Sequence, residues 1–216
     1  MGGYEYRRIR RLFHTPKGEV NGSGGRAAWG GGWLVAERGL GHYRFPVHLH
    51  NGPARMPYTP IVATLGYVLS ADGRRVLLIH RNVRADDQHL GKYNGLGGKL
   101  ERDEDVMAGM RREIREEAGI ECDSLALRGS ISWPGFGKQG EDWLGFIFLV
   151  STFTGSPFTE NSEGSLLWVE IDRIASLPLW EGDRQFLPLV FDADPRPFHG
   201  VMPYEGGRML SWSFSR

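Results

Sequence analysis

The stretch from Gly98 to Ile120, GKLERDEDVMAGMRREIREEAGI, constrains this chain more than any other part of it. It follows the glycine-rich segment Gly95-Leu96-Gly97-Gly98 and contains Glu113, Glu116 and Glu117. At 100° per residue, these glutamates occupy an arc of roughly 100° on one helix face. Carboxylates so close repel one another, so we expect a cation among them. Oxygen ligands in this number suit Mg²⁺, with Mn²⁺ as an alternative, and Mg²⁺ is commonly shared with substrate phosphates.

A plainer interpretation of the same charges is a solvated helix face on which acids and arginines form ion pairs one turn apart. The glycines that precede the helix favour the metal–phosphate site, because glycine lets the backbone approach a ligand closely. The chemistry of the residues alone leaves both interpretations open.

An apolar stripe runs along the same helix and should pack on a sheet. Its members recur every fourth residue, with one neighbour beside them: Val106, Met110, Ile114, Ala118 and Met107. Asp103 is the expected N-cap, and Gly119 stands where a C-terminal glycine belongs. Glu104 and Asp105 in the first turn complement the helix dipole. These signals predict a well-defined helix.

The fixed positions of this stretch resemble the Nudix box, G-x5-E-x7-R-E-U-x-E-E-x-G-U, in which U is an aliphatic residue. Every fixed position matches: Gly98, Glu104, Arg112, Glu113, Ile114, Glu116, Glu117, Gly119 and Ile120. The resemblance implies an α/β protein with the Nudix fold, an α/β/α sandwich around a mixed sheet. It also implies hydrolysis of a nucleoside diphosphate linked to another group, with Mg²⁺ required.

The composition limits the partners that such a protein can have. Lys and Arg number 26 and Asp and Glu number 26, so no net charge attracts a polyanion and we expect no nucleic-acid partner. Cys122 is the only cysteine, which excludes an intrachain disulfide and is compatible with a reducing compartment. No apolar run approaches the length of about 18 residues that spans a membrane. We therefore expect a soluble, cytoplasmic monomer or homodimer that acts on a small-molecule nucleotide without a membrane partner.

Residues 1–55 differ in texture from the remainder of the chain. They contain Gly24-Gly25 and Gly30-Gly31-Gly32 with arginines scattered among them, and no helical or alternating period persists. The apolar surface of residues 1–55 is too small to offset the entropy lost when a chain becomes ordered. We therefore expect a disordered, dispensable leader. The basic opening lacks the apolar core of a secretory signal, and Glu5 and Glu19 count against a transit peptide. Met56 is the expected start of the domain, and a second domain over 1–55 is the alternative.

Residues 56–216 have the pattern of one globular domain. Two strands joined by Ala71-Asp72-Gly73 predict a hairpin, and the end of the chain predicts another that turns near Glu205-Gly206-Gly207. The expected strands are 61–69, 75–79, 125–132, 143–153 and 166–171, the expected helices after the box are 171–176 and 183–191, and the closing hairpin is 198–214.

Three further segments resemble the 8-oxo-dGTP diphosphatases, the MutT-like enzymes that hydrolyse oxidised purine nucleoside triphosphates. These segments are KYNGLGGK at 92–99, NSEG at 161–164 with Trp168 and Val169 after it, and LWEGD at 179–183 with Phe186 and 198–200 after it. With the box, the resemblance covers about residues 60–214. It implies conversion of 8-oxo-dGTP to the monophosphate and pyrophosphate, and a role in nucleotide-pool sanitisation and hence DNA repair.

The resemblance also assigns the metal site. The implied ligands are the backbone carbonyl of Gly97 and the side chains of Glu113, Glu116, Glu117 and Glu163. Glu116 or Glu163 would accept the proton of the attacking water. Without the resemblance, Glu163 is an ordinary loop acid.

Several neighbouring residues receive supporting roles from the same resemblance. Arg112 would pair with carboxylates and orient Glu113, and Glu104 would support the junction between loop and helix. Lys99 would contact phosphate or an acid of the box. Arg81 and Arg84, in the polar loop 81–93, either reach a phosphate or are merely exposed.

The base pocket implied by the resemblance contains Asn94, Trp180, Asp183 and Trp133, with Trp143 at its edge. Aromatic faces stack on a base for roughly 1–3 kcal/mol, and Asn and Asp can bond its polar edge. An oxidised guanine offers an N7–H donor where guanine has an acceptor, and a site built for a donor rejects a base that lacks it. Each aromatic alone is also explained as a core residue.

The chain departs from the broad-specificity relatives at one position. They have two adjacent aspartates after the tryptophan, whereas here Gly182 takes the first place and only Asp183 remains. Paired carboxylates can share a proton and so bind more than one tautomeric pattern. Activity on 2-hydroxy-dATP or methylated purines is therefore not expected from the resemblance alone.

Two alternatives to an 8-oxo-dGTP diphosphatase remain at this stage. The chemistry could be the same and the substrate a nucleotide sugar, a dinucleoside polyphosphate or a capped RNA end. A Nudix domain that binds a nucleotide without hydrolysing it is the other alternative, against which stands the complete set of acids in the box.

Overall fold

The computed structural model describes residues 57–216. The expected leader over 1–55 and the expected start at Met56 lie outside the described residues. The strands are β1 (Ile61–Leu69), β2 (Arg75–His80), β3 (Tyr93–Asn94), β4 (Glu121–Trp133), β5 (Trp143–Thr154), β6 (Ser165–Glu170), β7 (Phe198–Val201), β8 (Tyr204–Glu205), β9 (Arg208–Met209) and β10 (Ser213–Ser215). The helices are α2 (Val106–Ala118), the 3₁₀ helix η1 (Ile171–Ser176) and α3 (Asp183–Val190).

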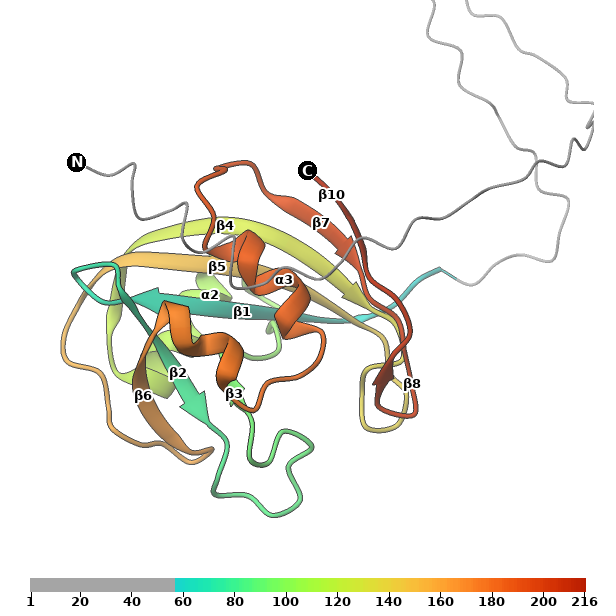
Figure 1. Ribbon diagram of the computed structural model, residues 1–216, viewed down its shortest axis with the longest axis horizontal. Helices are drawn as coiled ribbons and strands as arrows, with labels where there is room; N and C mark the ends of the chain where they lie inside the picture. Colours follow the sequence, from blue (N-terminus) through green and yellow to red (C-terminus); the bar gives the residue numbers. More distant parts are fainter. Residues whose placement is uncertain (1–56) are drawn as a thin grey trace, which may run out of the picture. The chain divides into compact units, whose positions relative to one another are not determined.

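One mixed sheet dominates the described part of the chain (Figure 1). Its strand order is β10-β7-β4-β5-β1-β2-β3, and β6 pairs with β2 beside this path. The pairs β1–β5 and β4–β7 are parallel, and the other pairs of this sheet are antiparallel. A small hairpin, β8–β9, turns at Gly206 and Gly207 as expected.

The central strands bury side chains on both faces of the sheet, so they read as apolar runs rather than as alternating ones. In β2, Val76 and Leu78 join one core cluster, whereas Leu77 and Ile79 join the other. Because side chains alternate along a strand, each cluster lies on its own face. Helices must cover both faces, and they do.

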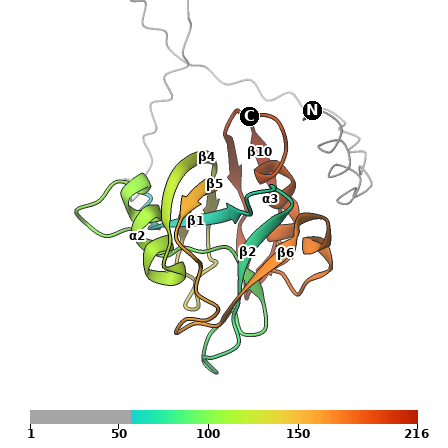
Figure 2. The same ribbon diagram turned by 90° about the vertical axis from the view of Figure 1, so that its left-hand side faces the viewer.

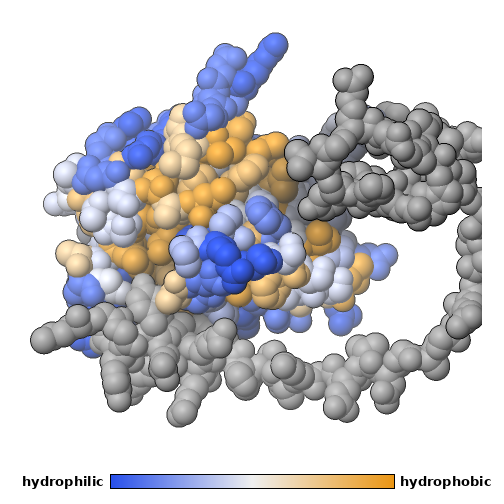
Figure 3. Space-filling view, turned by 90° about the horizontal axis from the view of Figure 1, so that it is seen from above, coloured by the Kyte–Doolittle hydropathy of each residue, from blue (hydrophilic) through white to orange (hydrophobic). Residues whose placement is uncertain are grey.

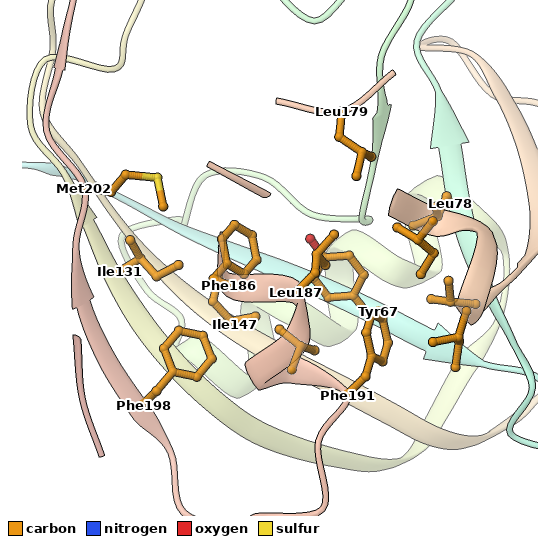
Figure 4. Close-up of a cluster of buried hydrophobic side chains, with 14 of the residues drawn as sticks. Tyr67, Leu78, Ile131, Ile147, Leu179, Phe186, Leu187, Phe191, Phe198 and Met202 are labelled. Atoms are coloured by element: carbon orange, nitrogen blue, oxygen red, sulfur yellow. The ribbon is translucent and has the colours of Figure 1, made fainter. Parts of the chain in front are cut away.

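Helix α2 covers one face, and α3 with η1 covers the other (Figure 2). Met110, Ile114 and Ala118 of α2 are fully buried against the sheet. Figure 4 shows the opposite core, in which Phe186 and Leu187 of α3 pack among side chains from the sheet. The α/β/α sandwich and the mixed sheet expected from the sequence are confirmed.

The sequence predicted the C-terminal end of α2 correctly but not its N-terminal end. Gly119 closes the helix in the left-handed conformation with φ of 70°, as expected. The expected N-cap, Asp103, is wrong: the Asp105 side chain accepts hydrogen bonds from the backbone of Met107 and Ala108 instead. Asp105 therefore caps the helix rather than complementing its dipole from within. Met107, expected beside the apolar stripe, is exposed.

The expected strands and helices after the box are present, with one substantial extension. Strand β4 begins at Glu121 rather than at residue 125, and its pairing with β5 shifts register three times, including between Leu127 and Gly129. The extra residue at this last shift is Arg128, whose buried side chain bonds the carbonyls that end α3. Bulges of this kind re-aim a side chain and hide a strand's alternation from sequence reading.

Figure 3 shows hydrophobic residues gathered on one face of the molecule and rimmed by hydrophilic ones. Large exposed apolar side chains include Val201 of β7 and Phe214 of β10.

None of the helices within residues 57–216 is long and apolar enough to cross a membrane.

Candidate active site

The site begins with the glycine loop, which lies across β1. Gly66 N–H donates to the Leu96 carbonyl at 2.6 Å, and Thr64 N–H donates to the Gly98 carbonyl at 2.8 Å. Gly97 has φ of 144°, and a Cβ there would overlap the Thr64 carbonyl. Only glycine fits this contact, which explains why the loop needs its glycine here.

Two acids of α2, Glu113 and Glu117, face this loop. Glu117 accepts a hydrogen bond from the Gly97 N–H at 2.8 Å. The carboxylate of Glu113 lies so close to Gly98 that a Cβ at that glycine would collide with it. The glycine loop and the acidic helix face predicted from the sequence thus form one unit.

Arg112 holds the remaining acids of the box in place. Its guanidinium donates to both oxygens of Glu104, at 3.0 and 2.7 Å, and to Glu113 at 3.0 Å and Glu116 at 3.2 Å. Glu104 in turn accepts from the backbone N–H of Glu101, at the junction of loop and helix. The ion pairs of the plainer interpretation therefore exist, and Arg112 supplies part of the positive charge that the cluster needs.

Arg112 does not neutralise Glu117. Burial raises the pKa of Glu117 to about 8, with further increases from the nearby charges of Glu163 and Glu113, and the Gly97 N–H only partly opposes this. Burial also raises the pKa of Glu113, although Arg112 lowers it in part. The carboxylates nearest the glycine loop thus lack sufficient positive charge around them.

Asn161 brings Glu163 to the same place from a different part of the chain. Its side-chain amide donates to the Glu117 carbonyl at 3.0 Å, and its Oδ1 accepts from the backbone of Glu163 at 2.8 Å and Gly164 at 3.1 Å. Gly164 packs so tightly on β2 that a Cβ would overlap the His80 carbonyl. The loop before β6 is therefore fixed against the end of α2.

Arg81 and Arg84 both pair with Glu163. Arg81 also donates to Asp87 at 2.7 Å, and its side chain is only 14% exposed. Arg84 is half exposed and lies 3.5 Å from Glu163. Of the two possibilities left open by the sequence, simple exposure is wrong for Arg81, which lines the pocket described next.

The donor set fits a hard divalent cation, although it is not assembled around one. Among residues 57–216, no three His, Cys, Asp or Glu side chains converge as a metal-binding group. Glu113, Glu117 and Glu163 nevertheless supply carboxylate oxygens, and burial together with the charges of Glu163 and Glu113 raises the pKa of Glu117 more than Gly97 and Arg81 lower it. Oxygen donors of this kind are those that Mg²⁺ prefers. All five predicted ligands, Gly97, Glu113, Glu116, Glu117 and Glu163, stay predictions, and the Glu116 side chain is 59% exposed.

A pocket of about 380 Å³ opens beside these acids. Its walls contain all the residues that the resemblance assigned to the base: Asn94, Trp133, Trp180 and Asp183, with Trp143 and Lys99. Gly97, Gly98 and Glu163 line it as well. Lys99 lies over the ring of Trp143, with 5.5 Å between its Nζ and the ring centroid. The predicted base pocket and part of the predicted acid site therefore share one cavity.

Three polar atoms in the pocket wall are buried without a hydrogen-bond partner: Thr64 Oγ1, Asn94 Oδ1 and Trp143 Nε1. Buried polar atoms are rarely left unpaired, because each costs about 1–3 kcal/mol. Their position in one cavity indicates a polar ligand that supplies the missing partners.

Asp183 stands in the same wall with an altered acidity. Burial raises its pKa to about 7, and the Trp180 contact and the charge of Lys92 only partly oppose this. A carboxyl group with this pKa is partly protonated near neutral pH and can donate a hydrogen bond. It can therefore present a donor or an acceptor to a bound base.

The glycine beside Asp183 has no room for a side chain. A Cβ at Gly182 would overlap the Met202 sulfur and crowd the Tyr204 hydroxyl. Tyr204 lines the pocket, and burial raises its pKa well above the ordinary value of a phenol, so it stays neutral. An uncharged phenol and a thioether therefore fill the space beside Gly182, the position at which the resemblance expects a second carboxylate.

The sequence interpretation missed several pocket residues. His89 bonds both Asn94 and Trp180, and Phe136 contacts Trp180 edge-on with ring centroids 5.4 Å apart. Phe136 lies in the loop between β4 and β5 and Tyr204 begins β8, and no spacing rule connects them. His89 sits in a polar loop whose order depends on tertiary contacts. The only signal for His89 in the sequence is its position three residues before segment 92–94, which contains Tyr93 and lies between Gly91 and Gly95.

Comparison with known proteins agrees with this geometry. Residues 59–190 match the family model described as the NUDIX domain. The chain is 35% identical to the oxidized purine nucleoside triphosphate hydrolase of Mus musculus over 57% of this chain and 76% of that protein. It is 32% identical to the Danio rerio protein of the same name, over 66% of this chain and 86% of that one.

Among solved structures, the MutT protein from Bacillus halodurans superposes with a TM-score of 0.62 at 27% identity, covering 71% of this chain and 97% of that one. Helices on both faces of a mixed sheet, a glycine loop and an acidic helix beside a pocket define a hydrolase of phosphoric anhydrides. The chain belongs to the Nudix hydrolase family.

Proposed function

We propose that this Nudix hydrolase converts 8-oxo-dGTP and water to 8-oxo-dGMP and pyrophosphate, with Mg²⁺ as its cofactor, and so removes oxidised purines from the nucleotide pool. The observation that carries the proposal is the single cavity in which aromatic walls and polar base-binding groups adjoin the acids of the box. Two relatives named for oxidised purine triphosphates support the substrate. The same proposal places the protein in the cytoplasm, where free nucleotides occur.

The residues divide the work between base and phosphates. Trp133 and Trp180 hold the faces of the base, and Asn94 and Asp183 bond its polar edge. Arg81 and Lys99 line the pocket, Arg84 pairs with the pocket residue Glu163, and these cations can contact phosphate oxygens. This division orients the triphosphate so that its phosphorus atoms lie near the glycine loop.

The acids serve the bond-breaking step. Glu113, Glu117 and Glu163, with the Gly97 carbonyl and Glu116, would hold the divalent cation. When bound, the cation supplies charge neutralisation of the phosphates and of the departing monophosphate, 8-oxo-dGMP. Glu163 accepts the proton of the water that attacks the β-phosphorus, because it lines the pocket whereas Glu116 faces solvent. Arg112 holds Glu113 in orientation.

The test is a nucleotide panel with purified protein: 8-oxo-dGTP, dGTP, 2-hydroxy-dATP, a nucleotide sugar, a dinucleoside polyphosphate and capped RNA. We expect the highest kcat/KM for 8-oxo-dGTP, with a monophosphate and pyrophosphate as products. Because one carboxyl is missing beside Asp183, 2-hydroxy-dATP should be a poor substrate. A higher kcat/KM for any other member of the panel would replace the proposed substrate.

Glu117→Gln tests the metal assignment. Loss of this ligand should lower kcat by about 100-fold or more, since metal stabilisation of phosphate charge is worth several kcal/mol. Mg²⁺ should raise the Tm of the wild type but not of the variant, because only a protein that binds the ion gains stability from it. Undiminished Mg²⁺-dependent turnover in the variant would show that Glu117 is not a ligand.

A further inference from the structure

His89 is the meeting point of two groups that line the base pocket. Its Nδ1 atom lies 2.9 Å from the indole nitrogen of Trp180 and 3.0 Å from the side-chain nitrogen of Asn94. The imidazole contacts the Trp180 ring edge-on, with centroids 5.6 Å apart. The backbone N–H of His89 donates to Asp87 at 2.9 Å, which anchors the loop that holds the ring.

These contacts determine which atom of His89 is protonated. An indole N–H can only donate a hydrogen bond, so Nδ1 of His89 must be an acceptor. The imidazole is therefore neutral with its proton on Nε2, 3.2 Å from the side-chain amide of Gln88, which must turn its oxygen toward this N–H. Burial, followed by the charge of Arg81, lowers the pKa of His89 to about 4, which agrees with a neutral ring.

The tautomer of His89 in turn determines the orientation of Asn94. Because Nδ1 of His89 is an acceptor, the amide nitrogen of Asn94 must face it. If the amide oxygen of Asn94 faced Nδ1 instead, two lone pairs would repel each other. The amide oxygen must then point elsewhere, and Asn94 Oδ1 is buried at the pocket without a partner. A chain of two hydrogen bonds thus fixes one acceptor toward the cavity.

We propose that His89 is a positioning residue that sets base specificity by locking the Asn94 amide with its oxygen toward the ligand. This inference rests on the proposed function, in which the cavity takes a purine base. The bound base must offer an N–H or amino group to Asn94 Oδ1. A base that presents a lone pair there leaves the oxygen unpaired and is rejected. His89 touches no reacting atom and acts through Asn94.

Two substitutions of His89 separate the acceptor from the ring. In His89→Asn, the amide oxygen occupies the position of Nδ1 and keeps the acceptor. In His89→Phe, the ring remains but the acceptor is lost. His199→Phe is the matched control, since His199 is an exposed histidine on β7 that bonds Ser130 outside the pocket.

The probe is 8-oxo-dGMP, a product that is bound but not hydrolysed, measured by calorimetry. We expect His89→Phe to weaken binding about tenfold, which corresponds to about 1.4 kcal/mol. His89→Asn should stay within about threefold of the wild type, and His199→Phe should bind unchanged. In turnover of 8-oxo-dGTP, His89→Phe should raise KM about tenfold with kcat within about twofold.

A double-mutant cycle tests whether His89 acts through Asn94. Adding His89→Phe to Asn94→Ala should cause no further loss, because the group that His89 positions is already absent. Equal losses in His89→Asn and His89→Phe, independent losses in the cycle, or a loss confined to kcat would overturn the inference. If His89→Phe fails to fold, His89→Gln replaces it, since its carbonyl reaches the position of Nε2 rather than Nδ1.

Failure of the proposed function is distinguishable from failure of this inference. If the wild type does not bind 8-oxo-dGMP, the substrate is wrong. The same variants are then measured with the nucleoside monophosphate that the wild type binds best in the panel. A rescue by His89→Asn with that ligand supports the role of His89, and equal loss in both variants contradicts it.

Discussion

At the scale of single residues, the pocket is controlled by acids whose proton affinity the fold has changed. Asp183 has a pKa of about 7 because burial destabilises its charged form more than its neighbours stabilise that form. Glu117 has a pKa of about 8, and burial is again the largest cause. Asp183 thus gains the ability to donate to a base, and Glu117 holds its proton more tightly unless a cation beside it offsets the cost of burying its charge.

The raised pKa of Asp183 makes stability depend on pH. The unfolded chain ionises this acid at about 3.8 and the folded chain at about 7, so the folded state binds more protons between these values. The free energy of unfolding should fall from about pH 4 to pH 7, by at most about 1.4 kcal/mol per pH unit from this group, and level off above. Denaturant titrations should show a steeper fall between about pH 4 and pH 7 in the wild type than in Asp183→Asn, which keeps only the contribution of the other buried acids such as Glu117.

The same ionisation should affect substrate binding. Above about pH 7 the Asp183 carboxylate can no longer donate a hydrogen bond, so the KM for 8-oxo-dGTP should rise in the wild type. In Asp183→Asn, whose amide donates at every pH, this rise should be absent. A parallel rise of KM in both proteins would assign the titration to another group.

At the scale of elements, the ends of α2 and the glycine loop decide where the acids of the box stand. Gly119 ends the helix, and Asp105 begins it two residues later than the sequence indicated. Asp103 and Asp105 are chemically equivalent as caps, and the choice between them depends on the path of the preceding loop. That path is set by Glu104, which Arg112 holds from within the helix.

Asp105→Ala and Asp103→Ala are a matched pair for this choice. Removal of the cap at Asp105 should lower the free energy of unfolding by about 1 kcal/mol, because two backbone N–H groups lose their acceptor. Removal of Asp103, an exposed residue outside the helix, should change it by less than about 0.5 kcal/mol. Chemical denaturation measures both. A larger effect at Asp103 would restore the sequence-based assignment.

Gly97→Ala and Gly91→Ala separate backbone strain from steric overlap. Both glycines have positive φ, but a Cβ at Gly91 meets nothing within 4 Å, whereas one at Gly97 overlaps the Thr64 carbonyl. We expect a loss of about 1 kcal/mol for Gly91→Ala and about 3 kcal/mol or more for Gly97→Ala. Thermal unfolding should rank the two variants in this order, and equal losses would mean that the overlap relaxes.

At the scale of the molecule, two cores on opposite faces of one sheet hold the site together. The acidic helix belongs to one face, and Trp180 and Asp183 precede or begin α3 on the other (Figures 1 and 2). The pocket therefore draws on both layers. Arg128 connects them further, because it leaves β4 at a bulge and bonds the carbonyls of Leu189 and Val190 at the end of α3.

Arg128→Met should destabilise the whole domain. The substitution removes charge-assisted hydrogen bonds to three backbone carbonyls and to Asp192, at a cost of about 3 kcal/mol. Arg196→Ala is the control, since that arginine is 68% exposed and solvent screens its pair with Asp194. Urea unfolding should separate the two clearly, and similar midpoints would show that the Arg128 bonds are dispensable.

The sequence by itself determined the family, the helix that bears the acids and most of the strands. These features depend on local rules: fixed spacing in the box, period-2 and period-3.6 patterns, and turn residues such as Asp72-Gly73. It also indicated Asn94, Trp180 and Asp183, because the segments around them resemble known ones. All three line the pocket.

Only the tertiary structure decided how these residues are tuned. The pKa of Asp183, the space filled at Gly182, the bulge at Arg128 and the orientation of Asn94 all depend on groups distant in sequence. Burial and hydrogen-bond partners are properties of the packed molecule, and no spacing along the chain encodes them. His89 is the clearest case, since its role exists only where loop, strand β3 and the segment before α3 meet.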